Sequence, residues 1–264
     1  MPTPATSTAP RDARRIDGPG WSVIEGDAGS VLASLADGSF DLCYLDPPFG
    51  TGRTFASAAG GFDDRCSSAA EFGALIRPWI RQIHRVLAAH GSILLHADWR
   101  HSHRLRLWLE EVFGEAGFVN HLVWSYGLGG SSPRRFARKH DDILYFAKGP
   151  DYHFIPPRVP ASSARMKGML KKATDVLSIP AINNMAHERC GWPTQKPLAL
   201  LRMLIEACCP PGGRVLDPCM GSGTTLVAAI ETGRRAFGVD ASPAALEIAL
   251  TRLTAVESPL SAVG

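Results

Sequence analysis

The stretch VLDPCMGSGTTLVAA, at residues 215–229, decides the fold. Its first apolar residues are typical of a buried strand, which is expected to end at Asp217. The run Gly221-Ser222-Gly223 favours a tight turn, after which Thr224 begins a helical pattern. A second apolar run, AFGVD, follows this helix and ends at Asp240. A strand, a glycine turn, a helix and a second strand that ends in an acid form a nucleoside-binding unit of doubly wound α/β sheets.

The same unit limits which nucleoside can bind. The dinucleotide fingerprint Gly-x-Gly-x-x-Gly places pyrophosphate at a helix N-terminus, but no third glycine follows Gly223 at that spacing. The carboxylate of Asp217 would also repel pyrophosphate, whereas it would attract a cationic ligand that carries an amine. Asp240 is placed to accept hydrogen bonds from ribose hydroxyls. The pattern therefore favours S-adenosyl-L-methionine over NAD as the cofactor.

Further short apolar runs, each bounded by turn residues, predict the rest of the sheet. The expected strands are residues 22–25, 40–45, 92–96, 118–126, 142–147, 214–216 and 236–239. Helical periodicity lies between them, at residues 70–88, 103–113, 197–208, 224–232 and 243–255. This alternation predicts an α/β fold with a doubly wound, mostly parallel Rossmann-like sheet. Residues 50–64 and 156–188 show little periodicity and are expected to be irregular.

The position of the glycine turn indicates an unusual order of the two halves of the sheet. Only 41 residues follow Gly223, and one βαβ unit takes roughly 30 residues. Most of the sheet must therefore come from residues before the turn, so the order is circularly permuted. We expect a disordered arm at residues 1–20, one half of the sheet domain at 21–126, a small inserted basic region at 127–190 and a cofactor-binding half at 191–264.

A second stretch, DLCYLDPPFGTGR at residues 41–53, follows a predicted strand with Asp46-Pro47-Pro48-Phe49. Ligands of such sheets bind beyond the carboxyl ends of the strands, so this tetrad and the glycine turn can face one crevice. The Asp46 carboxylate and the Pro47 carbonyl could each accept one N–H of an exocyclic amine, which restores the lone pair of its nitrogen. The prolines restrict the backbone, and Phe49 offers a stacking face for a base flipped out of a duplex. The alternative is an ordinary turn, since Asp-Pro is common in turns.

Basic residues are concentrated in one segment. The formal net charge of the chain is +3, but residues 127–175 hold ten basic and four acidic residues, so the rest of the chain sums to −3. A local basic patch on a nearly neutral protein favours a nucleic acid partner, although a solvated loop would show the same pattern. The candidate DNA-binding residues are Arg53, Arg134, Arg135, Arg138, Lys139, Lys167, Lys171 and Lys172.

With these motifs the chain resembles the beta group of bacterial DNA amino-methyltransferases, which have the permuted order and modify adenine N6 or cytosine N4. The resemblance covers roughly residues 21–252. It rests on IEGDAGSVLASL (24–35), DLCYLDPPFGTGR (41–53), KHDDILYFAKG (139–149), GWPTQKPLALL (191–201), VLDPCMGSGTT (215–225) and GVDAS (238–242). It implies a methyltransferase that uses S-adenosyl-L-methionine and in which Asp46, Pro47, Pro48 and Phe49 are catalytic. It also implies that residues 21–126 are the catalytic half and that residues 127–190 recognise the DNA sequence.

The resemblance also implies which residues contact the cofactor. The methionine part would be held by Asp217, Gly221, Ser222, Gly223 and Thr224, the ribose by Asp240, and the adenine by Asp27 with Ala28. Asp46 would also contact the cofactor. Thr194, Gln195 and Lys196 would lie beside the cofactor, with Lys196 near its carboxylate. Alternatively, these three residues cap the helix that begins at Pro197.

Cys219 departs from the family pattern, which usually has an aromatic residue beside the cofactor at this position. A cysteine after proline could also suggest the nucleophile of cytosine C5 methylation, a reaction that needs covalent attack by a thiolate. We reject that interpretation because Asp-Pro-Pro-Phe is the amine-directed signature and requires no covalent intermediate. Cys219 is therefore expected to line the cofactor site.

The motifs also indicate which substrates are favoured. Adenine N6 is favoured over cytosine N4, because Asp46 stands where many N4 enzymes have serine. RNA and protein glutamine are less favoured, because those methyltransferases usually carry Asn-Pro-Pro-Tyr after the glycine loop. The intact tetrad argues against a protein that only binds DNA and has no catalytic activity.

Double-stranded DNA is the expected partner, and a homodimer and a cognate restriction endonuclease are further candidates. No apolar stretch approaches the roughly 20 residues of a membrane span. No two cysteines have the C-x-x-C spacing of a zinc site, so no metal is expected. We expect a bacterial protein that is cytoplasmic and associated with the nucleoid.

Overall fold

The computed structural model describes residues 14–64, 66, 68–127, 131–161, 165, 167–183 and 185–256. Of the expected disordered arm, residues 1–13 lie outside this description, but the arm was predicted too long. Arg14–Gly18 forms strand β1, which pairs antiparallel with β2 (Trp21–Glu25) at the edge of the main sheet. This strand could not be predicted from its sequence, RRIDG, because its residues are mostly exposed and show no apolar pattern. An ion pair of 2.8 Å between Arg14 and Glu247 joins it to the C-terminal helix.

The described strands form a nine-stranded main sheet in the order β1-β2-β13-β12-β3-β6-β8-β7-β11. The strands after β2 in this order are β13 (Arg235–Asp240), β12 (Arg214–Asp217), β3 (Phe40–Leu45), β6 (Leu87–Ala97), β8 (His140–Ala147), β7 (Phe118–Ser125) and β11 (Val176–Ser178). Strands β2, β13, β12, β3 and β6 are parallel, whereas β8 is antiparallel to both of its neighbours. The predicted α/β class and mostly parallel sheet are confirmed.

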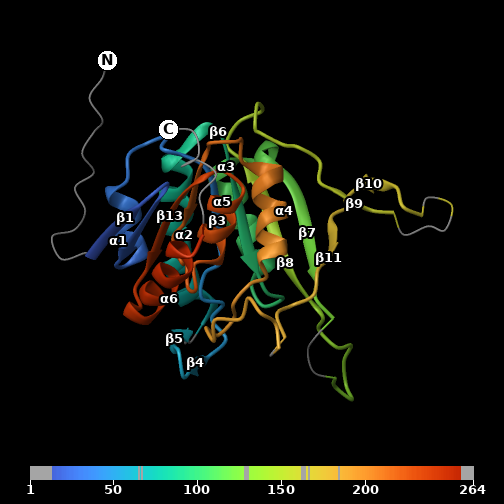
Figure 1. Cartoon of the computed structure of the whole chain (residues 1–264), viewed down its shortest axis with the longest axis horizontal. Coiled ribbons are helices and arrows are strands. Elements are labelled where there is room, and N and C mark those ends of the chain that lie inside the picture. Colours follow the sequence, from blue (N-terminus) through green and yellow to red (C-terminus); the bar gives the residue numbers. More distant parts are fainter. Residues whose placement is uncertain are drawn as a thin grey trace.

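Helices cover both faces of this sheet (Figure 1). They are α1 (Ala28–Ser34), α2 (Ala69–Val86), α3 (Ser102–Phe113), α4 (Leu198–Cys208), α5 (Thr224–Glu231) and α6 (Pro243–Thr254), with a short 3-10 helix at Glu115–Gly117. Leu42 and Tyr44 of β3 pack in a core cluster with α4, α5 and α6, whereas Cys43 and Leu45 pack in a second cluster with α1, α2 and α3. None of the described helices combines the length and the apolar character needed to cross a membrane.

Several short elements were not predicted. Residues 50–64, expected to be irregular, contain the hairpin of β4 (Arg53–Ser57) and β5 (Gly60–Asp64). Residues 156–188 contain the hairpin of β9 (Arg158–Pro160) and β10 (Leu170–Lys172), as well as β11. Helix α1 is only seven residues long. These elements bury few apolar side chains or are too short for a hydrophobic period to reveal them.

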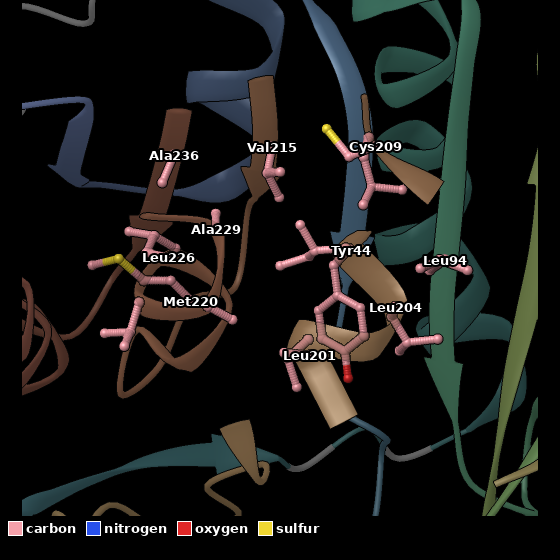
Figure 2. Close-up of a cluster of buried hydrophobic side chains, with 14 of the residues drawn as sticks. Tyr44, Leu94, Leu201, Leu204, Cys209, Val215, Met220, Leu226, Ala229 and Ala236 are labelled. Carbon is pink, nitrogen blue, oxygen red and sulfur yellow. The ribbon is translucent and has the colours of Figure 1, made fainter. Parts of the chain in front are cut away.

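Leu94→Ala is expected to lower the free energy of unfolding by about 2–5 kcal/mol, because truncating a fully buried side chain leaves a cavity. Leu94 lies on β6 in the core cluster that contains Tyr44, Leu201 and Leu204 (Figure 2). Urea denaturation followed by circular dichroism measures the loss. The control is Leu107→Ala on α3, where the residue is 59% exposed and the change should stay within about 0.5 kcal/mol. Equal losses in the two variants would contradict the described core.

Candidate active site

Three parallel strands end side by side at one edge of the main sheet. β12 pairs with β3 and with β13, and its Leu216 is the Cα partner of Cys43. This register brings Asp46, Asp217 and Asp240 to a common edge, although they come from distant parts of the sequence. A cavity of about 520 Å³ opens there, and all three acids line it.

Most of the residues predicted to bind a cofactor lie on the wall of this cavity. They are Asp27, Ala28, Asp46, Thr194, Lys196, Asp217, Cys219, Gly221, Ser222, Thr224 and Asp240, joined by Pro47, Pro48 and Phe49 of the tetrad. Gly223 is absent from the wall. It is the N-cap of α5 with a left-handed φ of 72°, and a Cβ added to it would lie 2.8 Å from Cβ of Ala249. This glycine therefore shapes the turn without facing the cavity.

Asp240 fixes the other glycine of the turn. The amide of Gly221 donates to Oδ2 of Asp240 at 2.9 Å, and the amide of Ser242 donates to Oδ1 at 2.9 Å. Each carboxylate oxygen has a second lone pair, which can accept a hydrogen bond from a hydroxyl group of a ligand. A side chain at residue 221 has no room, because its Cβ would lie 2.9 Å from Nε1 of Trp192. Trp192 itself lines the cavity, and the sequence analysis did not identify it.

Asp217 is the buried acid of the cavity. Its Oδ1 accepts a hydrogen bond from the amide of Cys219 at 3.0 Å, and only 2% of the residue is exposed. Burial, with the negative charges of Asp46 and Asp240, raises the pKa of Asp217 to about 7. Burial and the same three acids raise the pKa of the Cys219 thiol well above its usual value. The thiol is therefore protonated at neutral pH and is a poor nucleophile.

Asp46 has a partner that the sequence analysis did not assign to it. Nζ of Lys196 donates to Oδ2 of Asp46, and the two side chains are 10% and 19% exposed, respectively. The same ammonium lies 5.6 Å from the centre of the Phe49 ring. This ion pair holds one carboxylate oxygen of the tetrad in place. Contact between Lys196 and a cofactor carboxylate stays a prediction.

The segment that precedes α4 carries backbone strain. Thr194 has a φ of 60° and is the one non-glycine with positive φ among the described residues. The side chain of Gln195 accepts from the amide of Cys190 at 2.9 Å and donates to the carbonyl of Glu188 at 2.7 Å. The alternative role of residues 194–196 as a helix cap is wrong, because the carboxylate of Glu188 accepts from the first amide of α4 at 2.9 Å.

The β4–β5 hairpin forms one wall of the cavity. Asp64, the last residue of β5, is 2% exposed and accepts hydrogen bonds from the amides of residues 50 and 51 at 2.8 and 3.1 Å. It thereby fixes the chain just after the tetrad. Phe55 and Phe62 stack with 5.1 Å between their ring centres, and Phe62 stacks on Trp192 at 6.3 Å. The hairpin is thus joined to both motifs of the site.

A buried hydrogen-bonded group supports the ring of Phe49. His96 is fully buried on β6 and stacks on Phe49 with 5.8 Å between ring centres. Its Nδ1 is hydrogen-bonded to the hydroxyl of Tyr44 at 2.8 Å, and its Nε2 to Oδ2 of Asp141 at 3.2 Å. Burial opposes ionisation of Asp141, but the His96 hydrogen bond and nearby Lys196 lower its pKa overall. A lone histidine in the apolar run ILLHA was the sequence signal for this group.

The predicted DNA-binding residues lie on three separate parts of the chain. They are Arg53 on β4, Arg134, Arg135, Arg138 and Lys139 between β7 and β8, and Lys167, Lys171 and Lys172 in or beside the β9–β10 hairpin. The structure does not gather them into one cluster, and their contact with DNA stays a prediction. Within the described ranges, no group of three or more His, Cys, Asp and Glu side chains is arranged to hold a metal ion.

Comparison with known proteins reveals similar sequences. A family model described as DNA methylase, for N6 and N4 enzymes, matches residues 40–251. The chain is 28% identical to the type II methyltransferase M.ScaI of Streptomyces caespitosus, over 88% of this chain and 81% of that protein. It is 30% identical to the type II methyltransferase M.HpaI of Haemophilus parainfluenzae, over 88% and 73%. It is 26% identical to the DNA adenine methyltransferase YhdJ of Escherichia coli strain K12, over 88% and 82%.

Solved structures have the same fold. The PvuII DNA methyltransferase, which is cytosine-N4-specific, superposes with a TM-score of 0.66 at 16% identity, covering 92% of this chain and 89% of that one. M1.HpyAVI in its complex with SAM superposes with a TM-score of 0.59 at 21% identity, covering 88% of this chain and 99% of that one. At these identities the likeness establishes the fold alone.

Asp217→Asn is expected to change how stability depends on pH. A carboxyl whose pKa rises on folding, here to about 7, adds stability while it is protonated and loses that contribution as the pH rises towards 7. Asparagine keeps the shape and an acceptor oxygen but does not titrate. Between about pH 5 and pH 8, the urea midpoint of the ligand-free wild type should therefore fall relative to that of the variant. Parallel pH profiles would contradict the raised pKa.

Proposed function

Because the chain belongs to the family of DNA methylases that modify adenine N6 or cytosine N4, we propose that it methylates an exocyclic amine of a base flipped out of duplex DNA. The methyl donor is S-adenosyl-L-methionine, and the preferred target is adenine N6. One observation carries this proposal: Asp46 of the tetrad and Gly221 of the turn line the same cavity. A methyl acceptor and a methyl donor must be held together in this way to react.

The charge of the cavity wall is complementary to that of the proposed donor. Six aspartates line it, and Lys196 is the one basic side chain among the described lining residues. Asp240 would accept the ribose hydroxyls, and Asp27 with Ala28 would lie against the adenine. Asp27 is already positioned as the N-cap of α1, where it accepts from the amide of Ser30 at 2.8 Å.

The opposite part of the wall would hold the methionine end of the donor. Asp217 would attract the ammonium group, and its pKa of about 7 allows it to be ionised when the cation is bound. Thr194 and Lys196 lie where a carboxylate could be bound. The Gly221 turn lets the backbone approach the donor closely, because no side chain fits at that position.

The reaction follows from the placement of the two hydrogen-bond acceptors. The Asp46 carboxylate and the Pro47 carbonyl each accept one N–H of the target amine, so that the nitrogen lone pair points at the methyl carbon. The bound donor would supply its methyl group to this nitrogen and would keep the electron pair of the broken carbon–sulfur bond on its sulfur. The nitrogen then loses one proton, for which Asp46 is the adjacent base and water the final acceptor.

Phe49 provides the stacking face that holds the flipped base in the pocket. Stacking on one aromatic ring contributes roughly 1–3 kcal/mol and offsets much of the cost of unstacking the base from the duplex. His96 stacks against the Phe49 ring and is itself held by hydrogen bonds at both ring nitrogens. The Phe49 ring is therefore kept in position when a base stacks on it.

Adenine N6 is favoured by the first residue of the tetrad. Asp46 can accept a charge-assisted hydrogen bond from the amine, and the family resemblance associates many cytosine-N4 enzymes with serine at this position. YhdJ, at 26% identity, is an adenine methyltransferase. The alternative, cytosine N4, presents the same kind of amine to the same two acceptors.

The proposal extends to the arrangement of the chain and to its partners. We infer that the halves are circularly permuted, with the catalytic half at residues 21–126, the recognition region at 127–190 and the cofactor half at 191–264. We also infer a homodimer and a cognate restriction endonuclease, both suggested by the family resemblance. The substrate would be chromosomal DNA in a bacterial cytoplasm. Sedimentation of the purified protein tests for the dimer.

Asp46→Ala should abolish methylation while leaving binding of S-adenosyl-L-methionine within about threefold of the wild type. The variant loses one of the two acceptors of the target amine, and loss of a transition-state contact of this kind lowers the rate by about a hundredfold or more. Labelled donor, genomic DNA and the purified protein are incubated, and the digested nucleosides are identified by mass.

N6-methyladenine is the expected product of the wild type, whereas N4-methylcytosine would overturn the preferred target. The control is Asp151→Ala, an exposed acid after β8 at the opposite edge of the sheet, which should keep full activity. Full activity of Asp46→Ala would refute the role of the tetrad. Label that appears on RNA or protein but not on DNA would refute the proposed substrate.

The double variant Lys171→Ala, Lys172→Ala is expected to weaken DNA binding and to make it less dependent on salt. Each lost phosphate contact should reduce the slope of log affinity against log salt concentration by about 0.9. Both lysines lie on β10 in the proposed recognition region. Fluorescence anisotropy at several salt concentrations measures the slope. Arg81→Ala, an exposed position on α2, serves as the control; if both slopes equal that of the wild type, β10 does not contact DNA.

A further inference from the structure

The described residues of the connection between β7 and β8, at 126–127 and 131–139, project from the edge of the sheet at which the cavity opens. Ser125, at the end of β7, is paired with His140, at the start of β8, so both strands meet at this edge. Because β8 is antiparallel to β6 and β7 is antiparallel to β8, β7 ends at the same edge as β6. In Figure 1 this connection and the β4–β5 hairpin both extend below the sheet.

Phe136 is the exposed aromatic residue of this connection. The residue is 96% exposed, the highest value among the large apolar residues described as exposed. An aromatic ring in water forgoes the free energy that burial would provide, and a partner that covered the ring would recover it. The flanking residues Arg134 and Arg135 are exposed as well.

Cation–π contacts with Trp99 join the end of the connection near β8 to the rest of the protein. The guanidinium of Arg138 lies 3.3 Å from the centre of the Trp99 ring, and that of Arg100 lies 4.9 Å from it. Arg100 in turn forms an ion pair with Asp98, the first residue after β6 ends at Ala97, at the same edge of the sheet. Phe136 is thus presented outward from a fixed point beside the strand that carries His96.

The charge around Phe136 decides which partner fits. Two exposed arginines precede the ring and a third follows it two residues later, while the nearest acids in sequence are beyond Lys139. This surface would repel a basic partner and attract phosphates. An apolar ring flanked by arginines is the combination that enters a duplex between base pairs while its neighbours contact the backbone.

We infer that Phe136 enters the DNA duplex and fills the space vacated by the flipped target base. The inference rests on the proposed function, and it assigns a task that the tetrad cannot perform. Phe49 stabilises the base after it has entered the pocket, whereas Phe136 stabilises the duplex that the base has left. The two rings act on the two sides of one equilibrium, which would otherwise favour the paired base.

The test compares two duplexes that contain the site found by mapping methylated bases in DNA modified by the wild type. In one duplex the target base is paired, and in the other it lies opposite an abasic sugar and is therefore unpaired. Phe136→Ala should lower the single-turnover methylation rate about tenfold to a hundredfold on the paired duplex and less than about threefold on the unpaired one. Phe136→Trp should retain most of the rate on both.

The matched control is Phe154→Ala, an exposed aromatic position that follows β8 at the opposite edge of the sheet and is 45% exposed. It should behave as the wild type on both duplexes. A Phe136→Ala rate within twofold of the wild type on the paired duplex would overturn the inference. An equal loss on both duplexes would also overturn it, because the ring would then serve DNA affinity alone. If the wild type leaves no methylated base in DNA, so that no site can be mapped, the proposed function and this inference are overturned together.

Discussion

The site depends first on the pairing of β12 with β3. Val215 is the Cα partner of Leu42 and Leu216 that of Cys43, and the strands are parallel. Their carboxyl ends therefore meet at one edge, and the acids that lie there need no direct bond to hold them together. Both strands are buried on two faces: Leu42 and Val215 belong to one core cluster, and Cys43 and Leu216 belong to the other. The packing of the core that stabilises the fold therefore also holds the acids at the ends of these strands in place.

Side chains from elsewhere then complete the cavity around these strands. Trp192 lies against the Gly221 turn and stacks on Phe62 of the β4–β5 hairpin. Asp64 of the same hairpin holds the two amides that follow the tetrad. The segment after the tetrad, the hairpin and the glycine turn therefore position one another, and a shift of one would disturb the other two. The ion pair of Lys196 with Asp46 adds a direct link between the tetrad and the segment that precedes α4.

Motifs with their own local geometry could be predicted from the sequence. The acids at the ends of β12 and β13, the tetrad, and Gly221 and Ser222 of the glycine turn lie on one cavity wall as predicted, because each motif follows an apolar strand. Gly223 shapes the turn but does not reach the wall. Three-dimensional partners were less accessible. The sequence does not show that Lys196 reaches Asp46 or that His96 supports Phe49, since these contacts join segments far apart in the chain. It does not show that Glu188 caps α4 either, since the segment between them has no regular structure to predict. The β4–β5 hairpin escaped prediction because its strands are largely exposed and rich in small residues.

The acid-rich wall of the cavity has a consequence for turnover. Six carboxyl groups and one ammonium face the space in which the proposed donor binds, and such a wall attracts a cation more strongly than an uncharged group. Once its sulfur has given up the methyl group, the spent cofactor has lost one positive charge, and its attraction to the wall falls accordingly. On the proposed function, the composition of the pocket would thus favour exchange of the spent cofactor for fresh donor.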